Sequence, residues 1–286
     1  MATFRILGPG DEPALEAFLS RHADSSMFLR SNARTAGLQD RGAALQATYV
    51  AAWEDGRITG VAAHGWNGNV LVQAPAHLQD CVREAVARSG RPVCGLLGPW
   101  EQVAAARRAL GLEHAPTTVA GRDQLFSLRL ADLVVPEALG AGRVACRRTA
   151  TAELDLLVEW RVAFNVEALG QTDGPDLRAR SREDVIRTHE DGSSWVLLDG
   201  ATPVSYSDFN SRLPDMVQVG GVWTPAPLRG RGYARCVVAG SLLDARRDGV
   251  QRAVLFAEDP AAKRAYLAVG FRVVGEYGLL LFQQPG

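Results

Sequence analysis

Short apolar runs alternate along the chain with segments whose apolar residues recur at helical spacing. In the first half, runs typical of strands fall at 48–53, 58–63, 70–73 and 93–97. Asp55 and Gly56 lie between the first two runs, and an Asp-Gly pair there predicts a β-hairpin. Helical spacing follows at 78–86 and 102–110. The pattern predicts an α/β fold.

The second half repeats this order with clearer signals. Strands are expected at 144–148, 195–198, 204–210, 216–224, 253–257 and 273–282. Helices are expected at 153–169, 181–190, 230–248 and 261–269. Ser181 and Asp184 have the spacing of a capping-box variant, which predicts that the second helix begins there. The shared order of elements indicates a tandem duplication.

A loop-like segment divides the two halves. Residues 131–142 contain Pro136 and two glycines and carry no clear periodicity. We therefore expect two domains, at 1–130 and 144–286, with a linker over 131–143. At 286 residues and 47% hydrophobic composition, the chain is long enough for two cores.

Composition narrows the classes of partner. A net charge of −1, from 31 basic and 32 acidic residues, gives no electrostatic reason to expect a nucleic acid or an anionic membrane. The four cysteines are far apart and no histidines have metal-ligand spacing, so we expect reduced thiols and no metal. No apolar run approaches the ~20 residues that cross a bilayer. These features favour a cytoplasmic protein, either a monomer or a homodimer.

Residues 220–234 carry the most distinctive chemistry. An expected strand ends at Thr224, and Pro225 prevents further strand pairing. Gly230 and Gly232 then open a long helix, whose N-terminal N–H groups and dipole favour an anion such as a pyrophosphate. Upstream, the pair 220–221 is Gly-Gly, which suits a β-bulge or a close backbone approach.

These residues resemble the GNAT N-acetyltransferase superfamily. Arg229, Gly232 and Ala234 match its R/Q-x-x-G-x-G/A pyrophosphate loop. Residues 259–271 resemble its second coenzyme A motif, Asn-x-x-Ala-x-x-x-Tyr followed by Gly-Phe, with Asp259 in place of the usual asparagine. The resemblance implies two tandem GNAT-like domains, each a mostly antiparallel mixed sheet with flanking helices and a splayed central strand pair.

The resemblance also implies a donor and its binding residues. The donor is acetyl-CoA, and the acceptor is a primary amine on a small molecule, peptide or protein. Tyr266 matches the tyrosine that protonates the departing thiolate in many relatives, although it also lies on a core-facing helical stripe. The residues expected to bind coenzyme A are Val222, Trp223, Thr224, Arg229, Gly230, Arg231, Gly232, Tyr233, Ala234, Asp259 and Arg264.

The general base is open on the sequence. Relatives often place a glutamate on the strand before the loop, but 216–224 contains none; Gln218 has the alternation parity of Val222 and cannot take a proton. Glu167, near the end of a helix, is a substitute that also fits a solvated surface carboxylate. Three further carboxylates are candidates, each better explained as a surface charge: Asp208, Asp215 and Glu258.

The first domain lacks the pyrophosphate loop. Residues 70–80 occupy its expected place without the arginine or the glycines, and Leu110 stands where the tyrosine is expected. We interpret 1–130 as a degenerate GNAT-like domain and 144–286 as the catalytic one. Two classes of function are weighed: acetyl transfer to an amine by direct attack on the thioester, or acyl-CoA binding without turnover in a sensor or regulatory protein. A third possibility is another donor, a longer acyl-CoA or an aminoacyl-tRNA; the near-neutral charge argues against tRNA and the loop argues for coenzyme A.

Overall fold

The computed structural model describes residues 1–283 and divides the chain into two compact units. Unit 1 contains Met1–Leu125 and the C-terminal segment that starts at Val274, and unit 2 is Phe126–Val273. These boundaries differ from the expected ones. The expected linker belongs to unit 2, where it includes the 3₁₀ turn η2 (Leu130–Asp132) and the short helix α5 (Glu137–Gly140).

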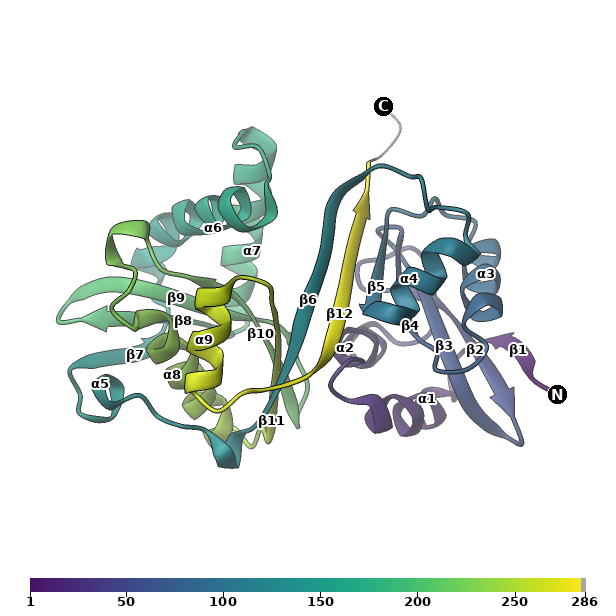
Figure 1. The fold of residues 1–286 in the computed structure, drawn as a ribbon, viewed down its shortest axis with the longest axis horizontal. Helices are drawn as coiled ribbons and strands as arrows, with labels where there is room; N and C mark the ends of the chain where they lie inside the picture. Colours follow the sequence, from purple (N-terminus) through teal and green to yellow (C-terminus); the bar gives the residue numbers. More distant parts are fainter. Residues whose placement is uncertain (284–286) are drawn as a thin grey trace. The chain divides into compact units, whose positions relative to one another are not determined.

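Unit 1 is a mixed sheet with helices on both faces (Figure 1). Its strands are ordered β1 (Thr3–Ile6), β2 (Ala47–Glu54), β3 (Arg57–Gly65), β4 (Asn69–Gln73), β5 (Gly95–Pro99), β12 (Arg272–Phe282) and β6 (Thr117–Arg129). Its helices are α1 (Glu12–Leu19), α2 (Met27–Ala36), α3 (Leu78–Ser89) and α4 (Trp100–Ala109), with the 3₁₀ turn η1 (Ser20–His22). Alternate residues of β2 pack on α1 and α2 or on α3.

Unit 2 repeats this architecture. Its strands are ordered β7 (Val144–Arg148), β8 (Ser194–Asp199), β9 (Thr202–Arg212), β10 (Met216–Trp223), β11 (Arg252–Ala257) and the end of β6. Its helices are α6 (Leu154–Leu169), α7 (Pro175–Glu190), α8 (Tyr233–Arg247) and α9 (Pro260–Ala268), with the 3₁₀ turns η3 (Thr151–Glu153) and η4 (Ala226–Leu228). One core lies beneath α8, and a smaller cluster joins α6 and α7 to β9. The predicted α/β fold is confirmed.

Two strands connect the units along the chain. β6 begins in unit 1 and ends in unit 2, where Phe126 and Leu128 enter the core beneath α8. β12 does the reverse: it leaves unit 2 after Val273 and pairs with β5 of unit 1, with Tyr277 opposite Pro99. Unit 1 thus contains a strand from the far end of the chain, and unit 2 begins within β6.

Two sequence predictions about helices and strands were wrong or incomplete. Ser181 does not cap a helix: it lies inside α7, is fully buried, and accepts a hydrogen bond from Asn165 Nδ2 at 3.2 Å. The helix instead begins at Pro175, where proline suits the first turn. β6 was not predicted, because its first half has polar or small side chains with a single larger apolar one, and all of them are exposed or half-buried.

Candidate active site

β10 and β11 pair only over their first residues. Parallel pairing joins Met216–Gln218 to Arg252–Val254, although both strands continue beyond it. The strands separate after Gln218, so the splayed central pair predicted for this unit is confirmed. Separation leaves the β11-facing backbone edge of residues 219–223 without a strand partner, and such N–H and C=O groups can bind a ligand instead.

A glycine bulge accompanies this separation. Gly220 lies opposite Asp208 and Trp223 opposite Tyr206, so β10 contains one more residue than β9 in this interval. Gly221 has a φ of +57°, a conformation that favours glycine. A Cβ on Gly221 would lie 2.6 Å from Arg161 Nη1 and from both Asp208 carboxylate oxygens. The predicted bulge is confirmed, and it brings an ion pair against the β10 backbone.

The loop before α8 has the backbone that an anion site needs. Gly230 and Gly232 have φ values of +78° and +81°, and nothing lies within 4 Å of a Cβ built on Gly230. Gly232 is the N-cap of α8 and has no side chain to bond the first N–H groups, which have no intrahelical carbonyl partner. The helix dipole adds a partial positive charge there. This end of α8 therefore fits a phosphate group.

Side chains around the loop differ in what they contact. Arg229 and Arg231 are exposed, whereas Ala234 is half-buried and Tyr233 is buried. The Tyr233 hydroxyl donates to Asp199 Oδ2 at 2.5 Å, so this side chain is directed at β8 and only its backbone remains at the loop.

Arg229 is already paired with a carboxylate. Its Nη1 and Nη2 lie 2.6 and 2.9 Å from the two Glu167 oxygens, and its Nε donates to the Thr224 carbonyl at 2.9 Å. The guanidinium also stacks 4.7 Å from the centre of the Trp223 ring. Glu167 is about half exposed and fully engaged by this ion pair, which fits the surface carboxylate that its sequence position suggested.

The end of β10 is held by neighbouring side chains. The Ser205 hydroxyl donates to the Trp223 carbonyl and contacts Thr224 Oγ1, both at 2.9 Å. The Trp223 ring meets Phe164 of α6 edge-on, with centroids 6.4 Å apart. Val222 packs partly buried against the core beneath α8. Three predicted donor-binding positions thus lie on an ordered backbone beside the strand separation.

On α9, Asp259 is the N-cap, and its side chain accepts a hydrogen bond from the Ala262 N–H at 2.7 Å. A carboxylate serves this capping role as well as asparagine does. Arg264 of the same helix is exposed.

Tyr266 belongs to the hydrophobic core of unit 2. Its side chain is 8% exposed, and its ring makes edge-on contacts with Phe126 and Phe271, with centroids 6.2 and 6.1 Å away. Burial raises the pKa of the phenol well above its usual value, and the nearby Asp259 acts in the same direction. The hydroxyl therefore stays protonated throughout the neutral range, as a proton donor requires.

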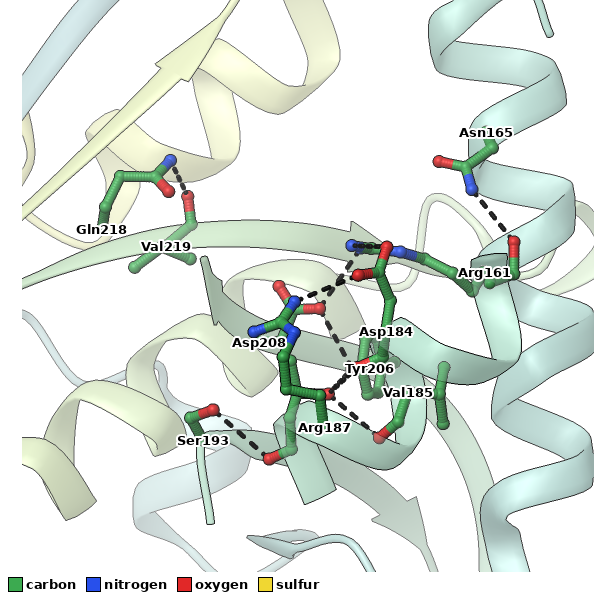
Figure 2. Close-up of polar contacts among 12 residues, drawn as sticks. Arg161, Asn165, Asp184, Val185, Arg187, Ser193, Tyr206, Asp208, Gln218 and Val219 are labelled. Atoms are coloured by element: carbon green, nitrogen blue, oxygen red, sulfur yellow. Dashed lines mark hydrogen bonds and ion pairs between the residues drawn. The ribbon is translucent and has the colours of Figure 1, made fainter. Parts of the chain in front are cut away.

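Gln218 is buried with an incomplete hydrogen-bond set. Its Nε2 donates to the Val219 carbonyl at 2.8 Å, and its Oε1 has no partner among residues 1–283 (Figure 2). The predicted parity with Val222 was wrong. Val219 and Val222 both pack on the core beneath α8, because the bulge between them shifts the alternation, and Gln218 faces the opposite side.

A buried polar cluster that the sequence did not identify lies on that opposite face. Asp208 of β9 is 1% exposed; Arg161 Nη1 donates to its Oδ2 at 3.2 Å and the Tyr206 hydroxyl at 3.1 Å (Figure 2). Arg161 also reaches Asp184 of α7 at 3.4 Å. The interpretation of Asp208 as a surface charge was therefore wrong.

The cluster has the electrostatics of a buried ion pair. Burial lowers the pKa of Arg161, but Asp208 and Asp184 outweigh it and the pKa is raised overall. Burial and the adjacent Asp208 raise the pKa of Tyr206 well above its usual value. Arg161 thus remains a cation and Tyr206 a neutral donor at physiological pH.

The remaining candidate carboxylates lie at the surface. Asp215 and Glu258 are exposed, in agreement with the surface reading of the sequence. Within residues 1–283, no three histidine, cysteine or acidic side chains are grouped so as to hold a metal ion. Within the same range, no helix has the length and apolar character needed to traverse a bilayer.

Unit 1 shares the strand separation but not the loop. The parallel pairing of β4 with β5 begins at Asn69 and Gly95 and ends at Leu71 and Leu97, before either strand ends. In the following loop, the Ala74 N–H donates to Gln102 Oε1 at 2.7 Å, so a side chain of unit 1 occupies this loop amide. His77 caps α3 with a left-handed backbone and pairs with Glu54 at 3.1 Å.

No protein-family model matches the sequence, and no curated protein matches it. Several solved structures are similar to this chain. A GCN5-related N-acetyltransferase from Sphaerobacter thermophilus matches with a TM-score of 0.58 and 18% identity, over 100% of this chain and 96% of that one. A GCN5-related N-acetyltransferase from Kribbella flavida matches with a TM-score of 0.56 and 18% identity, over 98% and 97% of the two chains.

A tandem GNAT protein from the clavulanic acid biosynthesis pathway is similar over 100% of both chains, with a TM-score of 0.54 and 12% identity. The chain has the tandem GNAT fold. In unit 2, β10 leads into the 229–234 loop and then into α8. The GNAT unit formed by the N-terminal residues has the same strand separation with a different loop.

Proposed function

We propose that this GNAT-fold chain is an N-acetyltransferase that moves an acetyl group from acetyl-CoA to a primary amine. The observation that carries the proposal is the combination of separated strands β10 and β11 with a two-glycine loop at the start of α8. This combination offers hydrogen-bond partners for an extended thioester arm and a positive helix terminus for its pyrophosphate. It is found on unit 2 alone among the described parts of the chain.

The donor would be held by backbone more than by side chains. The N–H groups at the start of α8 and the exposed Arg229 and Arg231 suit the pyrophosphate. The unpaired β11-facing edge at Val222 and Trp223 suits the pantetheine arm, and Thr224, whose carbonyl accepts from Arg229, continues this stretch. Asp259 has one carboxylate oxygen on its own helix, so it contributes chiefly by fixing α9. Arg264, which is exposed on α9, is available to bind the other phosphate group of the donor.

The chemistry is direct attack of the amine on the thioester carbon. The new C–N bond forms as the C–S bond breaks, and the departing thiolate takes a proton from the Tyr266 hydroxyl. Burial raises the pKa of the phenol, so Tyr266 carries its proton at neutral pH when the thiolate departs. Gln218, buried on the opposite face from the core, can orient a water molecule or the amine.

A second candidate is an acyl-CoA sensor without turnover. The specific observation in its favour is that Glu167 is engaged by Arg229, while Gln218 has no basic group. In this case the chain would bind acetyl-CoA and release no coenzyme A with any amine.

Calorimetric titration with acetyl-CoA, together with coenzyme A release over a panel of primary amines, separates these functions. The transferase binds one donor per chain and releases coenzyme A only when an amine is present. Tyr266→Phe should lower kcat by ~10²–10⁴-fold, as for other general acids, and leave donor affinity unchanged. An unchanged kcat would remove Tyr266 as the acid, and binding without release would favour the sensor.

A further inference from the structure

Asp208 is a buried carboxylate with one oxygen unused. Its Oδ2 accepts from Tyr206 and from Arg161, whereas its Oδ1 has no hydrogen-bond partner within residues 1–283. Buried polar groups are nearly always paired, and an unpaired one costs about 1–3 kcal/mol, more when it is charged. This oxygen therefore does not serve the stability of the fold.

The position of Asp208 relates it to the separated strands. It lies opposite Gly220 in the β9–β10 ladder, and both its oxygens would be 2.6 Å from a Cβ on Gly221. The carboxylate thus rests against the bulge in β10, within the stretch that no longer pairs with β11. Among residues 1–283, the other candidate carboxylates lie elsewhere: Asp215 and Glu258 are exposed, and Glu167 is paired with Arg229.

Arg161 balances the charge of Asp208 but leaves one of its carboxylate oxygens without a hydrogen bond. Its contacts to Asp208 and Asp184 are long, at 3.2 and 3.4 Å, compared with 2.6 Å between Arg229 and Glu167. Both Arg161 and the Tyr206 hydroxyl bond the same oxygen, Oδ2. Oδ1, although buried, therefore keeps the capacity to accept one more hydrogen bond, which an amine N–H can supply.

We propose that Asp208 binds the acceptor amine through Oδ1 and takes its proton. The assignment rests on the proposed acetyl transfer. One ammonium proton passes to Oδ1, the nitrogen lone pair forms the C–N bond, and the C–S bond breaks. The thiolate takes the Tyr266 proton, and the second proton that the nitrogen loses as the amide forms passes through solvent to the Tyr266 phenolate. Asp208 then releases its proton to solvent, so that both residues are restored. Arg161 and Tyr206 act as positioning residues, because they hold Oδ2 and aim Oδ1.

Two matched probe amines test this role: ethylamine, mostly protonated at neutral pH, and 2,2,2-trifluoroethylamine, of similar size but far less basic and mostly neutral. Asp208→Asn preserves shape but cannot take a proton. We expect kcat/KM for ethylamine to fall by ~10²–10⁴-fold. The loss for trifluoroethylamine should be much smaller, because this amine needs no deprotonation before attack.

The control is Asp184→Asn, which removes the other carboxylate partner of Arg161. This variant should keep kcat/KM for both amines close to the wild-type values. Calorimetric titration with acetyl-CoA checks that each variant keeps its donor site. Equal losses for both amines, or the same losses in Asp184→Asn, would assign Asp208 a structural role and overturn the proposal.

If Asp208→Asn does not fold, Asp208→Glu gives the same comparison, since it keeps the charge for Arg161 but displaces the oxygen. Again kcat/KM should fall further for ethylamine than for trifluoroethylamine, and equal decreases in kcat/KM overturn the proposal. Wild-type protein that binds acetyl-CoA but releases no coenzyme A with any amine refutes acetyl transfer itself, and the assignment of Asp208 with it.

Discussion

At the scale of single residues, the ion pair between Glu167 and Arg229 bears directly on donor binding. Both carboxylate oxygens of Glu167 contact the guanidinium that the sequence assigned to a pyrophosphate. A phosphate arriving at the loop must compete with this carboxylate for the same N–H groups. If Arg229 binds the donor as proposed, Glu167 therefore opposes that binding.

Replacement of Glu167 by glutamine should tighten acetyl-CoA binding, because it removes that competition while keeping the side chain's size. An exposed ion pair contributes up to ~1 kcal/mol, so we expect an increase in affinity of up to ~5-fold. Calorimetric titration measures it, and Glu159→Gln, another exposed α6 carboxylate paired with an arginine, is the control. Weaker binding in Glu167→Gln would show that the carboxylate helps the donor instead.

The sequence identified the loop residues better than the acid–base residues. Gly230 and Gly232 need particular backbone conformations, and their local motif reveals this. Asp208 is instead paired inside the protein with Arg161, which lies on α6, 47 positions away in the sequence. A single aspartate in a strand carries no local signal of such a partner, so it resembled a surface charge.

At the scale of elements, the bulge in β10 determines which side chains face which side of the sheet. Its extra residue shifts the alternation between Gln218 and Val222, which reversed one prediction based on strand parity. The Gly-Gly pair correctly indicated an irregular strand. The direction of the side chains after it could not be deduced, because a bulge can fall at either glycine.

Gly221→Ala should destabilise the chain more than Gly249→Ala. Both glycines have positive φ, at +57° and +92°, so both substitutions incur backbone strain of ~1 kcal/mol or more. Only at Gly221 does the new Cβ meet other atoms, those of Arg161 and Asp208; nothing lies within 4 Å at Gly249. Urea midpoints compare the two variants, and equal midpoints would show that the ion pair moves aside freely.

At the scale of the whole molecule, the return of β12 to unit 1 and the start of unit 2 within β6 explain why the expected domain boundaries differ from the observed units. Local composition placed the boundary in 131–143, where Pro136 and two glycines interrupt the pattern. Unit 2 nevertheless begins at Phe126, and the pairing of β12 with β5 joins residues more than 170 positions apart. Such distant pairing leaves no trace in a local pattern.

A fragment of residues 126–273 should therefore fold where one of residues 144–273 does not. The shorter fragment lacks Phe126, Leu128 and Leu130, which are at most 2% exposed in the unit 2 core. Burial of three such side chains contributes about 5–9 kcal/mol, comparable with the ~5–15 kcal/mol stability of a whole domain. Thermal unfolding by circular dichroism distinguishes them, and cooperative melting of both at one temperature would contradict the prediction.

Because β12 belongs to unit 1 but follows all of unit 2 in the sequence, the order of synthesis differs from the order in which the units can be completed. Domains usually fold on the ribosome from the N-terminus onward. Here the sheet of unit 1 lacks the neighbour of β5 until residues 274–282 have been translated. During translation, the nascent chain therefore exposes the unpaired edge of β5, where another strand can pair wrongly. A chaperone that binds this edge would prevent such mispairing.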